Sequence, residues 1–158
     1  MTKDVIISLT GFQFMQEDGE PEPVAVVTGG QYYFKNGTHY LIYDELVEGF
    51  SGSTHNIIKF RPDRLQVHKK GLINVEMIFE EGKKTSASYM TPLGVIDMGL
   101  AATGFSLEEE ENRIQFHVEY SLSVDQAYSA DCRIDLEIRS KEEGNFRLDE
   151  GIEKKTEE

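Results

Sequence analysis

Alternation of apolar and polar residues is the clearest signal in this sequence, and it is strongest between residues 114 and 124. Apolar side chains occupy every second position there, at Ile114, Phe116, Val118, Tyr120, Leu122 and Val124. A period of two residues is typical of a β-strand with one buried and one exposed face. At about 3.3 Å per residue this strand would be about 35 Å long, so several partner strands must cover its apolar face.

The rest of the chain repeats this pattern in shorter segments separated by turn sequences. Further strands are expected at residues 5–14, 24–35, 38–47, 54–60, 64–68, 72–80, 83–90, 95–102 and 132–139. Asn36-Gly37 predicts a tight hairpin turn, because both residues tolerate a positive φ, and Glu81-Gly82 predicts a second one. Gly11 allows a bulge or a bend in the first strand, and Gly29-Gly30 predicts a break or a bend in the second. No helical period extends over any length.

Strands joined by short turns predict an antiparallel meander. A meander of this length must either split into a sandwich or close on itself, and closure removes the exposed edges. We therefore predict an all-β fold, an up-and-down meander closed into a barrel of about eight to ten strands, with a sandwich as the alternative. Residues 107–112, which contain four glutamates at 108–111, predict a solvated turn that has room for one turn of helix.

Length and cysteine content fit a single domain without covalent cross-links. A chain of 158 residues can bury about 70% of its unfolded surface. The only cysteine, Cys132, excludes an internal disulfide and fits a reducing compartment. We expect residues 1–139 to form the barrel domain, and residues 140–158 to form a charged tail that is disordered or a frayed helix.

The strong negative charge limits the partners. A formal net charge of −13 opposes general binding to nucleic acid or to an anionic membrane surface. The N-terminus lacks the pattern of a secretory signal, and no uncharged apolar run is long enough to span a bilayer. We therefore expect an acidic cytoplasmic protein with no nucleic-acid and no membrane partner.

Four short motifs resemble a known family. They are Tyr32-Tyr33-Phe34-Lys35-Asn36-Gly37, Tyr43-Asp44-Glu45, Met77-Ile78-Phe79 before Gly82, and Tyr89-Met90-Thr91-Pro92-Leu93-Gly94. Over about residues 4–139 the chain resembles the YwiB-like family of small uncharacterised proteins from Firmicute bacteria. The corner from Tyr89 to Gly94 is the most specific part of the match. The resemblance implies a lipocalin-like (calycin) β-barrel and no established activity.

Tyrosines are candidates to line a ligand pocket. A barrel of about eight strands is either filled by side chains or holds one small ligand. A filled core with a pocket at one mouth and a central cavity therefore remain alternatives. Tyr33, Tyr43 and Tyr89 each combine an apolar ring with a hydroxyl group, which suits the mouth of such a pocket. The alternative is that these tyrosines cover the sheet by cross-strand pairing.

Charged and polar residues complete the candidate ligand site. Lys59 and Arg61 lie in a locally basic segment, where either could meet an anionic group of a ligand, or could simply belong to the exposed face of the sheet. Glu45 belongs to an acidic group at the end of its strand. Thr91 belongs to the corner that we expect to fix the rim of the barrel mouth.

No motif for nucleophilic catalysis, phosphate binding or zinc binding is present. His39, His55, His68 and His117 lie on separate predicted strands without the spacing of a metal site. We therefore expect no catalytic residue, no metal and no cofactor. The preferred hypothesis is a barrel that binds a small, partly apolar or anionic ligand without catalysis. The alternatives are a filled, homodimeric interaction module, and an enzyme in which His55 meets Glu45 or Asp44.

Overall fold

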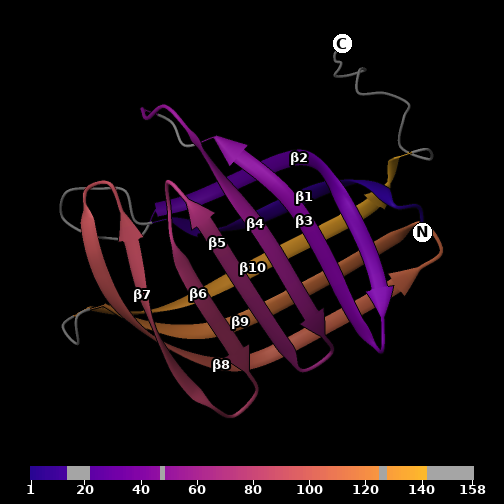
Figure 1. Ribbon diagram of the computed structural model, residues 1–158. Helices are drawn as coiled ribbons and strands as arrows, with labels where there is room; N and C mark the ends of the chain where they lie inside the picture. The colour runs from indigo at the N-terminus through magenta and orange to yellow at the C-terminus, as the bar shows by residue number, and fades with distance from the viewer. Residues whose placement is uncertain (14–21, 47–48, 125–127, 142–158) are drawn as a thin grey trace.

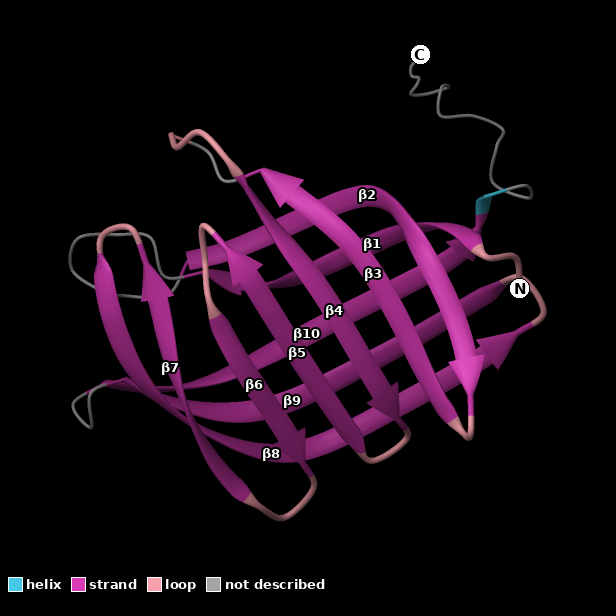
Figure 2. Cartoon of the chain, viewed as in Figure 1, coloured by secondary structure: helices cyan, strands magenta, loops and turns pink. Residues whose placement is uncertain are grey.

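The computed structural model describes residues 1–13, 22–46, 49–124 and 128–141, which form ten strands (Figures 1 and 2). The strands are β1 (Asp4–Gln13), β2 (Glu22–Lys35), β3 (Thr38–Leu46), β4 (Ser53–Arg61), β5 (Arg64–Gly71), β6 (Val75–Glu80), β7 (Lys84–Thr91), β8 (Gly94–Glu110), β9 (Arg113–Val124) and β10 (Tyr128–Ser140). All paired strands are antiparallel, so the predicted all-β meander is confirmed.

One sheet contains all ten strands, in the order β6-β5-β4-β3-β2-β1-β10-β9-β8-β7. The first and last strands pair with each other, and β6 and β7 are the two edges of the sheet. Within the described residues, β6 and β7 are connected by their tight turn and by one backbone bridge between Asn74 and Met90. In Figure 1, β3 to β6 cross in front of β8 to β10. The sheet is thus a nearly closed barrel with one seam, as the predicted closure requires.

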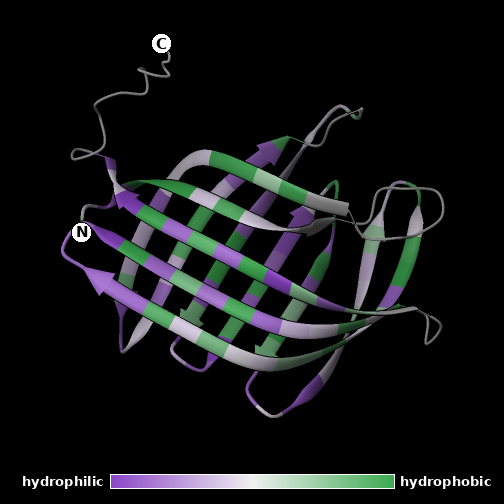
Figure 3. Ribbon diagram, turned by 180° about the vertical axis from the view of Figure 1, so that it is seen from behind, coloured by the Kyte–Doolittle hydropathy of each residue, from purple (hydrophilic) through white to green (hydrophobic). Residues whose placement is uncertain are grey.

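Alternate residues of the strands form the core. Figure 3 shows apolar and polar bands alternating along the strands that face the viewer. In β9 all six apolar positions between Ile114 and Val124 are buried, as their period of two residues predicts. Phe60, Phe79 and Phe116 are among the largest fully buried side chains, so much of the interior is filled.

The two predicted hairpin turns are confirmed. Asn36 and Gly37 have φ values of 53° and 79°, which is the pair of positive angles that a type I′ turn requires. Gly82 also has a positive φ, of 77°, in the turn between β6 and β7.

The bend in β2 is confirmed as well. The first part of this strand pairs with β1 and the last part, from Gln31, pairs with β3. Figure 1 shows β2 curving between the two layers of the barrel. At Gly30 a Cβ atom would lie 2.6 Å from Ile7 Cδ1 and 2.8 Å from the Ile42 carbonyl oxygen. Only glycine allows the backbone to approach its neighbours this closely.

The predicted turn at residues 107–112 is much shorter in the structure. β8 continues as a strand to Glu110, which pairs with Arg113 of β9. Phe105 and Leu107 pack against the core, so the alternation carries the strand into the acidic run. The four glutamates are exposed, and the turn comes only at Glu111 and Asn112.

The last residue of β10 connects the N-terminal segment to the turn between β8 and β9. The Ser140 hydroxyl donates a hydrogen bond to Asn112 Oδ1 at 3.0 Å and accepts one from the Thr2 backbone N–H at 3.2 Å. Of the predicted tail at 140–158, residues 142–158 lie outside the described residues. No helix in the described ranges is both long enough and apolar enough to cross a bilayer.

Stacked rings fill one end of the barrel. His39 is 2% exposed and stacks on Phe60, which stacks on Phe116, with 4.6 Å between ring centroids in both pairs. The Tyr32 hydroxyl is 2.8 Å from His39 Nδ1, and Glu109 Oε1 is 3.7 Å from His39 Nε2. Burial lowers the pKa of His39, although the negative charge of Glu109 acts in the opposite direction. Burial, followed by the charge of Glu109, raises the pKa of Tyr32 to about 12.

We expect His39 to make the free energy of unfolding depend on pH. Because its pKa in the folded state lies below the ordinary 6.5, the unfolded chain binds this proton more readily. The stability from neutral His39 is therefore complete above pH 6.5 and is lost as the pH falls through the folded-state pKa, by up to about 1.4 kcal/mol per pH unit. Urea unfolding at about pH 7.5 and about pH 5.5 measures this loss. The His39→Gln variant should lose less stability on acidification than the wild type, and equal losses would contradict the assignment.

Candidate ligand-binding pocket

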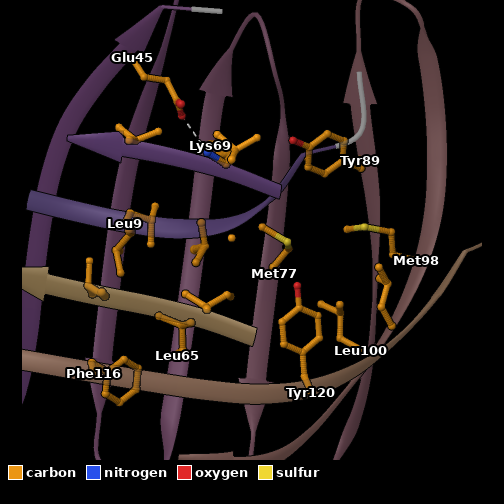
Figure 4. A pocket seen from close by; sticks show the side chains of 18 of the residues that line it. Leu9, Glu45, Leu65, Lys69, Met77, Tyr89, Met98, Leu100, Phe116 and Tyr120 are labelled. Atoms are coloured by element: carbon orange, nitrogen blue, oxygen red, sulfur yellow. Dashed lines mark hydrogen bonds and ion pairs between the residues drawn. The ribbon is translucent and has the colours of Figure 1, made fainter. Parts of the chain in front are cut away.

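Beyond the stacked rings, the barrel interior contains a pocket of about 90 Å³. Its walls are mainly apolar and include Leu9, Leu65, Leu100 and Phe116 (Figure 4). One water molecule needs about 10–15 Å³ of cavity volume. The pocket is therefore large enough for several waters or for a slender organic group. The interior is therefore mostly filled, with a narrow hollow that remains.

One side of the pocket is polar. Lys69 Nζ lies 2.8 Å from Glu45 Oε1 and donates a hydrogen bond to Asn56 Oδ1 at 2.8 Å. Asn56 Nδ2 in turn donates to Glu45 Oε1 at 3.0 Å. The side chains of Lys69 and Glu45 are only 16% and 17% exposed, so their two charges neutralise each other largely out of water. Figure 4 shows this pair across the pocket from Phe116.

Three tyrosines add hydroxyl groups to the lining. Tyr43 is 4% exposed, and its buried hydroxyl has no hydrogen-bond partner among the described residues. Burial, followed by the negative charge of Glu45, raises the pKa of Tyr43, so this hydroxyl stays protonated and can donate. Tyr120 hydrogen-bonds with Cys132, and burial raises the pKa of both groups. Tyr89 and Tyr120 flank Met77 in Figure 4.

Of the seven residues that the sequence predicts for ligand binding, the structure brings Tyr43, Glu45 and Tyr89 together in this pocket. They occupy inward positions of β3 and β7, near the ends of those strands. Their contact with a ligand stays a prediction.

The other four lie elsewhere. Tyr33 is 39% exposed, with Lys3 Nζ 5.4 Å from its ring centre. Thr91 Oγ1 accepts a hydrogen bond from the Leu93 N–H and donates one to the Gly94 carbonyl, so this side chain shapes the turn between β7 and β8.

Lys59 and Arg61 line a separate hollow on the outer face of β3, β4 and β5. Lys59 Nζ lies 5.7 Å from the centre of the Tyr40 ring. Arg61 Nε donates to Thr38 Oγ1 at 2.8 Å and its Nη2 donates to the Asn36 carbonyl at 3.2 Å, so the guanidinium supports the hairpin turn. The structure thus separates these two cations from the interior pocket.

The histidines form no joint site with the pocket. His55 Nδ1 lies 2.6 Å from Asp44 Oδ1 on the exposed surface, whereas Glu45 is directed inward. Among the described residues, no group of three or more histidine, cysteine or acidic side chains could hold a metal ion.

Two residues of this site were missed in the sequence analysis: Lys69, which lines the pocket, and Asn56, which hydrogen-bonds to Lys69 behind it. The alternation of apolar and polar positions could have indicated that both residues face the interior. Lys69 follows Leu65 and Val67 at alternate positions of β5, and Asn56 precedes Ile58 in the same way in β4. This alternation places both polar residues on the buried face.

Comparison with known proteins identifies the family. Residues 7–136 match the model described as "Domain of unknown function (DUF1934)". The chain belongs to this family. It is 25% identical over 124 residues to "Uncharacterized beta-barrel protein YwiB" of Bacillus subtilis (strain 168), covering 78% of this chain and 86% of that protein. The predicted resemblance to YwiB-like proteins is therefore confirmed.

A solved structure supports the fold of this domain. The crystal structure of the ywiB protein from Bacillus subtilis superposes with a TM-score of 0.66 at 19% sequence identity, covering 87% of this chain and 93% of that chain. This likeness shows a shared fold. The lipocalin-like (calycin) grouping stays a prediction.

Proposed function

We propose that the protein binds a small, partly apolar molecule in the interior pocket and releases it unchanged. The observation that carries this proposal is the hydroxyl of Tyr43, which is buried beside an apolar hollow without a partner among the described residues. A buried hydroxyl without a hydrogen bond costs about 1–3 kcal/mol. A ligand that supplies an acceptor would remove this cost.

The walls favour a slender apolar chain with an uncharged polar end. Burial of apolar surface contributes about 25 cal/mol per Å², and most of the lining is aliphatic or aromatic. Lys69 is already neutralised by Glu45 at 2.8 Å. The polar side therefore suits a hydroxyl, carbonyl or amide group better than an isolated anion. Of the two kinds of ligand expected from the sequence, we therefore propose the partly apolar one and not the anionic one.

The chemistry of the pocket supports binding more than catalysis. Burial raises the pKa values of Tyr43 and Tyr120, and also that of the Cys132 thiol beside Tyr120. These groups are therefore protonated at neutral pH, whereas an activated nucleophile has a lowered pKa or an adjacent base.

Tyr43→Phe separates binding from folding. We expect the variant to be about 1 kcal/mol more stable than the wild type, because an unsatisfied buried hydroxyl is removed. We expect its affinity for octanol, a slender uncharged probe, to fall about tenfold, because the hydrogen bond to the probe is lost. Urea unfolding and isothermal titration calorimetry measure the two effects.

Tyr32→Phe is the matched control, because its hydroxyl is bonded to His39 in the stacked aromatic end. This variant should lose stability and keep its affinity for octanol. The proposed function would be wrong if octanol did not bind to the wild type. The role of Tyr43 would be wrong if Tyr43→Phe bound octanol normally. Independently of the octanol titration, native mass spectrometry of protein from its own host, before and after refolding, would give the mass of a resident ligand.

A further inference from the structure

A second hollow lies against the outside of the same barrel wall. It is a groove of about 690 Å³ bordered by residues of β1, β8, β9 and β10. Its charged lining consists of Glu119, Asp131, Arg133 and Asp135. The groove is therefore polar where the interior pocket is apolar.

The wall between groove and pocket is split. Pairing of β1 with β10 ends at Thr10 and Asp135. Beyond this pair β1 continues along β2 alone as far as Gln13, and the earlier residues of β10 pair only with β9. The two strands that close the barrel thus separate at the end that holds the pocket.

Gly11 and Tyr120 lie at this split and line both hollows. Gly11 follows Val5, Ile7 and Leu9 at alternate positions, so a side chain there would be directed inward. Apart from its two chain neighbours, the only atom of the described residues within 4 Å of a Cβ atom at Gly11 would be Ile134 Cγ1, at 3.8 Å. The pocket and the groove are therefore adjacent where β1 has no side chain to divide them.

The charges of the groove favour a cation. Arg133 Nε donates a hydrogen bond to Asp135 Oδ1 at 2.7 Å, and His117 Nδ1 contacts the same carboxylate. Arg133 also lies directly opposite Glu119 in the pairing of β9 with β10, and Asp131 Oδ1 accepts a hydrogen bond from the Ser121 hydroxyl at 3.4 Å. The groove lining therefore contains one cation, Arg133, against the three carboxylates of Glu119, Asp131 and Asp135. This excess of negative charge attracts a positive group.

We propose that the ligand is an apolar chain with an uncharged hydrogen-bonding group at its inner end and a cationic group, such as an ammonium, at its outer end. The chain lies in the pocket and passes the split at Gly11, and the cation lies in the groove near Glu119 and Asp131. This inference rests on the proposed function and adds the charge and the orientation of the ligand.

Three probes of equal chain length test the charge preference by titration calorimetry: an eight-carbon amino alcohol, octanol, and the eight-carbon hydroxy acid. We expect the amino alcohol to bind about tenfold more tightly than octanol, and the hydroxy acid to bind more weakly than octanol. In Glu119→Gln with Asp131→Asn, the amino alcohol and octanol should bind equally. Glu108→Gln with Glu110→Gln is the control, because it removes two exposed carboxylates of β8 outside the groove and should keep the preference.

Gly11→Leu tests whether the ligand passes from the pocket to the groove through the split at Gly11. Its side chain should occupy the split and weaken binding of the amino alcohol at least tenfold. Thermal unfolding verifies that the variant is folded. Octanol binding without a preference for the amino alcohol would overturn the inference and leave the proposed function intact. Normal binding of the amino alcohol to folded Gly11→Leu would overturn the passage, and failure of all three probes would overturn both proposals.

Discussion

Replacing Gly30 with valine is expected to lower the free energy of unfolding by about 3 kcal/mol or more. A Cβ atom at this position would lie 2.6 Å from Ile7 Cδ1, 2.8 Å from the Ile42 carbonyl oxygen and 3.1 Å from Tyr43 Cβ. Side chains can shift slightly, but the carbonyl oxygen belongs to the backbone of β3 and is fixed by the sheet. The added methyl groups of valine would force β2 away from β3 at its bend. Urea unfolding followed by circular dichroism measures the loss.

Gly29→Val is the matched control in the same strand. Gly29 is exposed, and its nearest atom to an added Cβ is the Val5 carbonyl oxygen at 3.9 Å. Valine also favours the strand conformation, so this variant should retain the stability of the wild type. Equal losses in the two variants would show that the close approach at Gly30 is not what requires glycine in β2.

Lys69→Met is expected to cost about 3 kcal/mol of stability. The variant leaves the carboxylate of Glu45 in a largely buried position without its cation, and Asn56 Oδ1 also loses a donor. Breaking one side of a buried ion pair costs more than the pair itself contributes, because the remaining charge is desolvated without compensation. Urea unfolding at neutral pH measures the difference from the wild type.

A second substitution should restore much of this loss. In Lys69→Met with Glu45→Leu both charges are absent and apolar groups occupy the space, so we expect the double variant to be clearly more stable than Lys69→Met alone. Arg113→Met is the control on the outer face, where Arg113 pairs with Glu137 at 2.7 Å and is 42% exposed. It should change stability little, because water and salt screen such a pair. A double variant no more stable than Lys69→Met would contradict the explanation.

Most of the fold could be predicted from the sequence, because the period of two residues directly determines which face of a strand is buried. The turn at Asn36 and Gly37 could also be predicted, because both residue types tolerate the positive φ values that they adopt there. The error at residues 107–112 has a physical reason. A run of glutamates indicates that side chains are solvated, which is correct here, but it does not determine how the backbone pairs. Leu107 already indicated that the alternation continued.

The candidate site was only partly predictable. Tyr32 and Tyr33 are consecutive, so only one can face the interior, and two identical side chains do not indicate which one. The structure buries Tyr32 and exposes Tyr33. Lys69 was missed because a lysine is usually exposed, and its partner Glu45 is 24 residues away in the sequence. Only the register of β3, β4 and β5 brings the two together.

The pairing of the first strand with the last also determines when the barrel can close during synthesis. Residues 5–10 of β1 form their closing ladder with residues 135–140 of β10, so the ribosome must make nearly the whole described chain before that ladder can form. Until then β1 has one unpaired edge, and such an edge can pair with another chain. The barrel can therefore be completed only near the end of translation or after it.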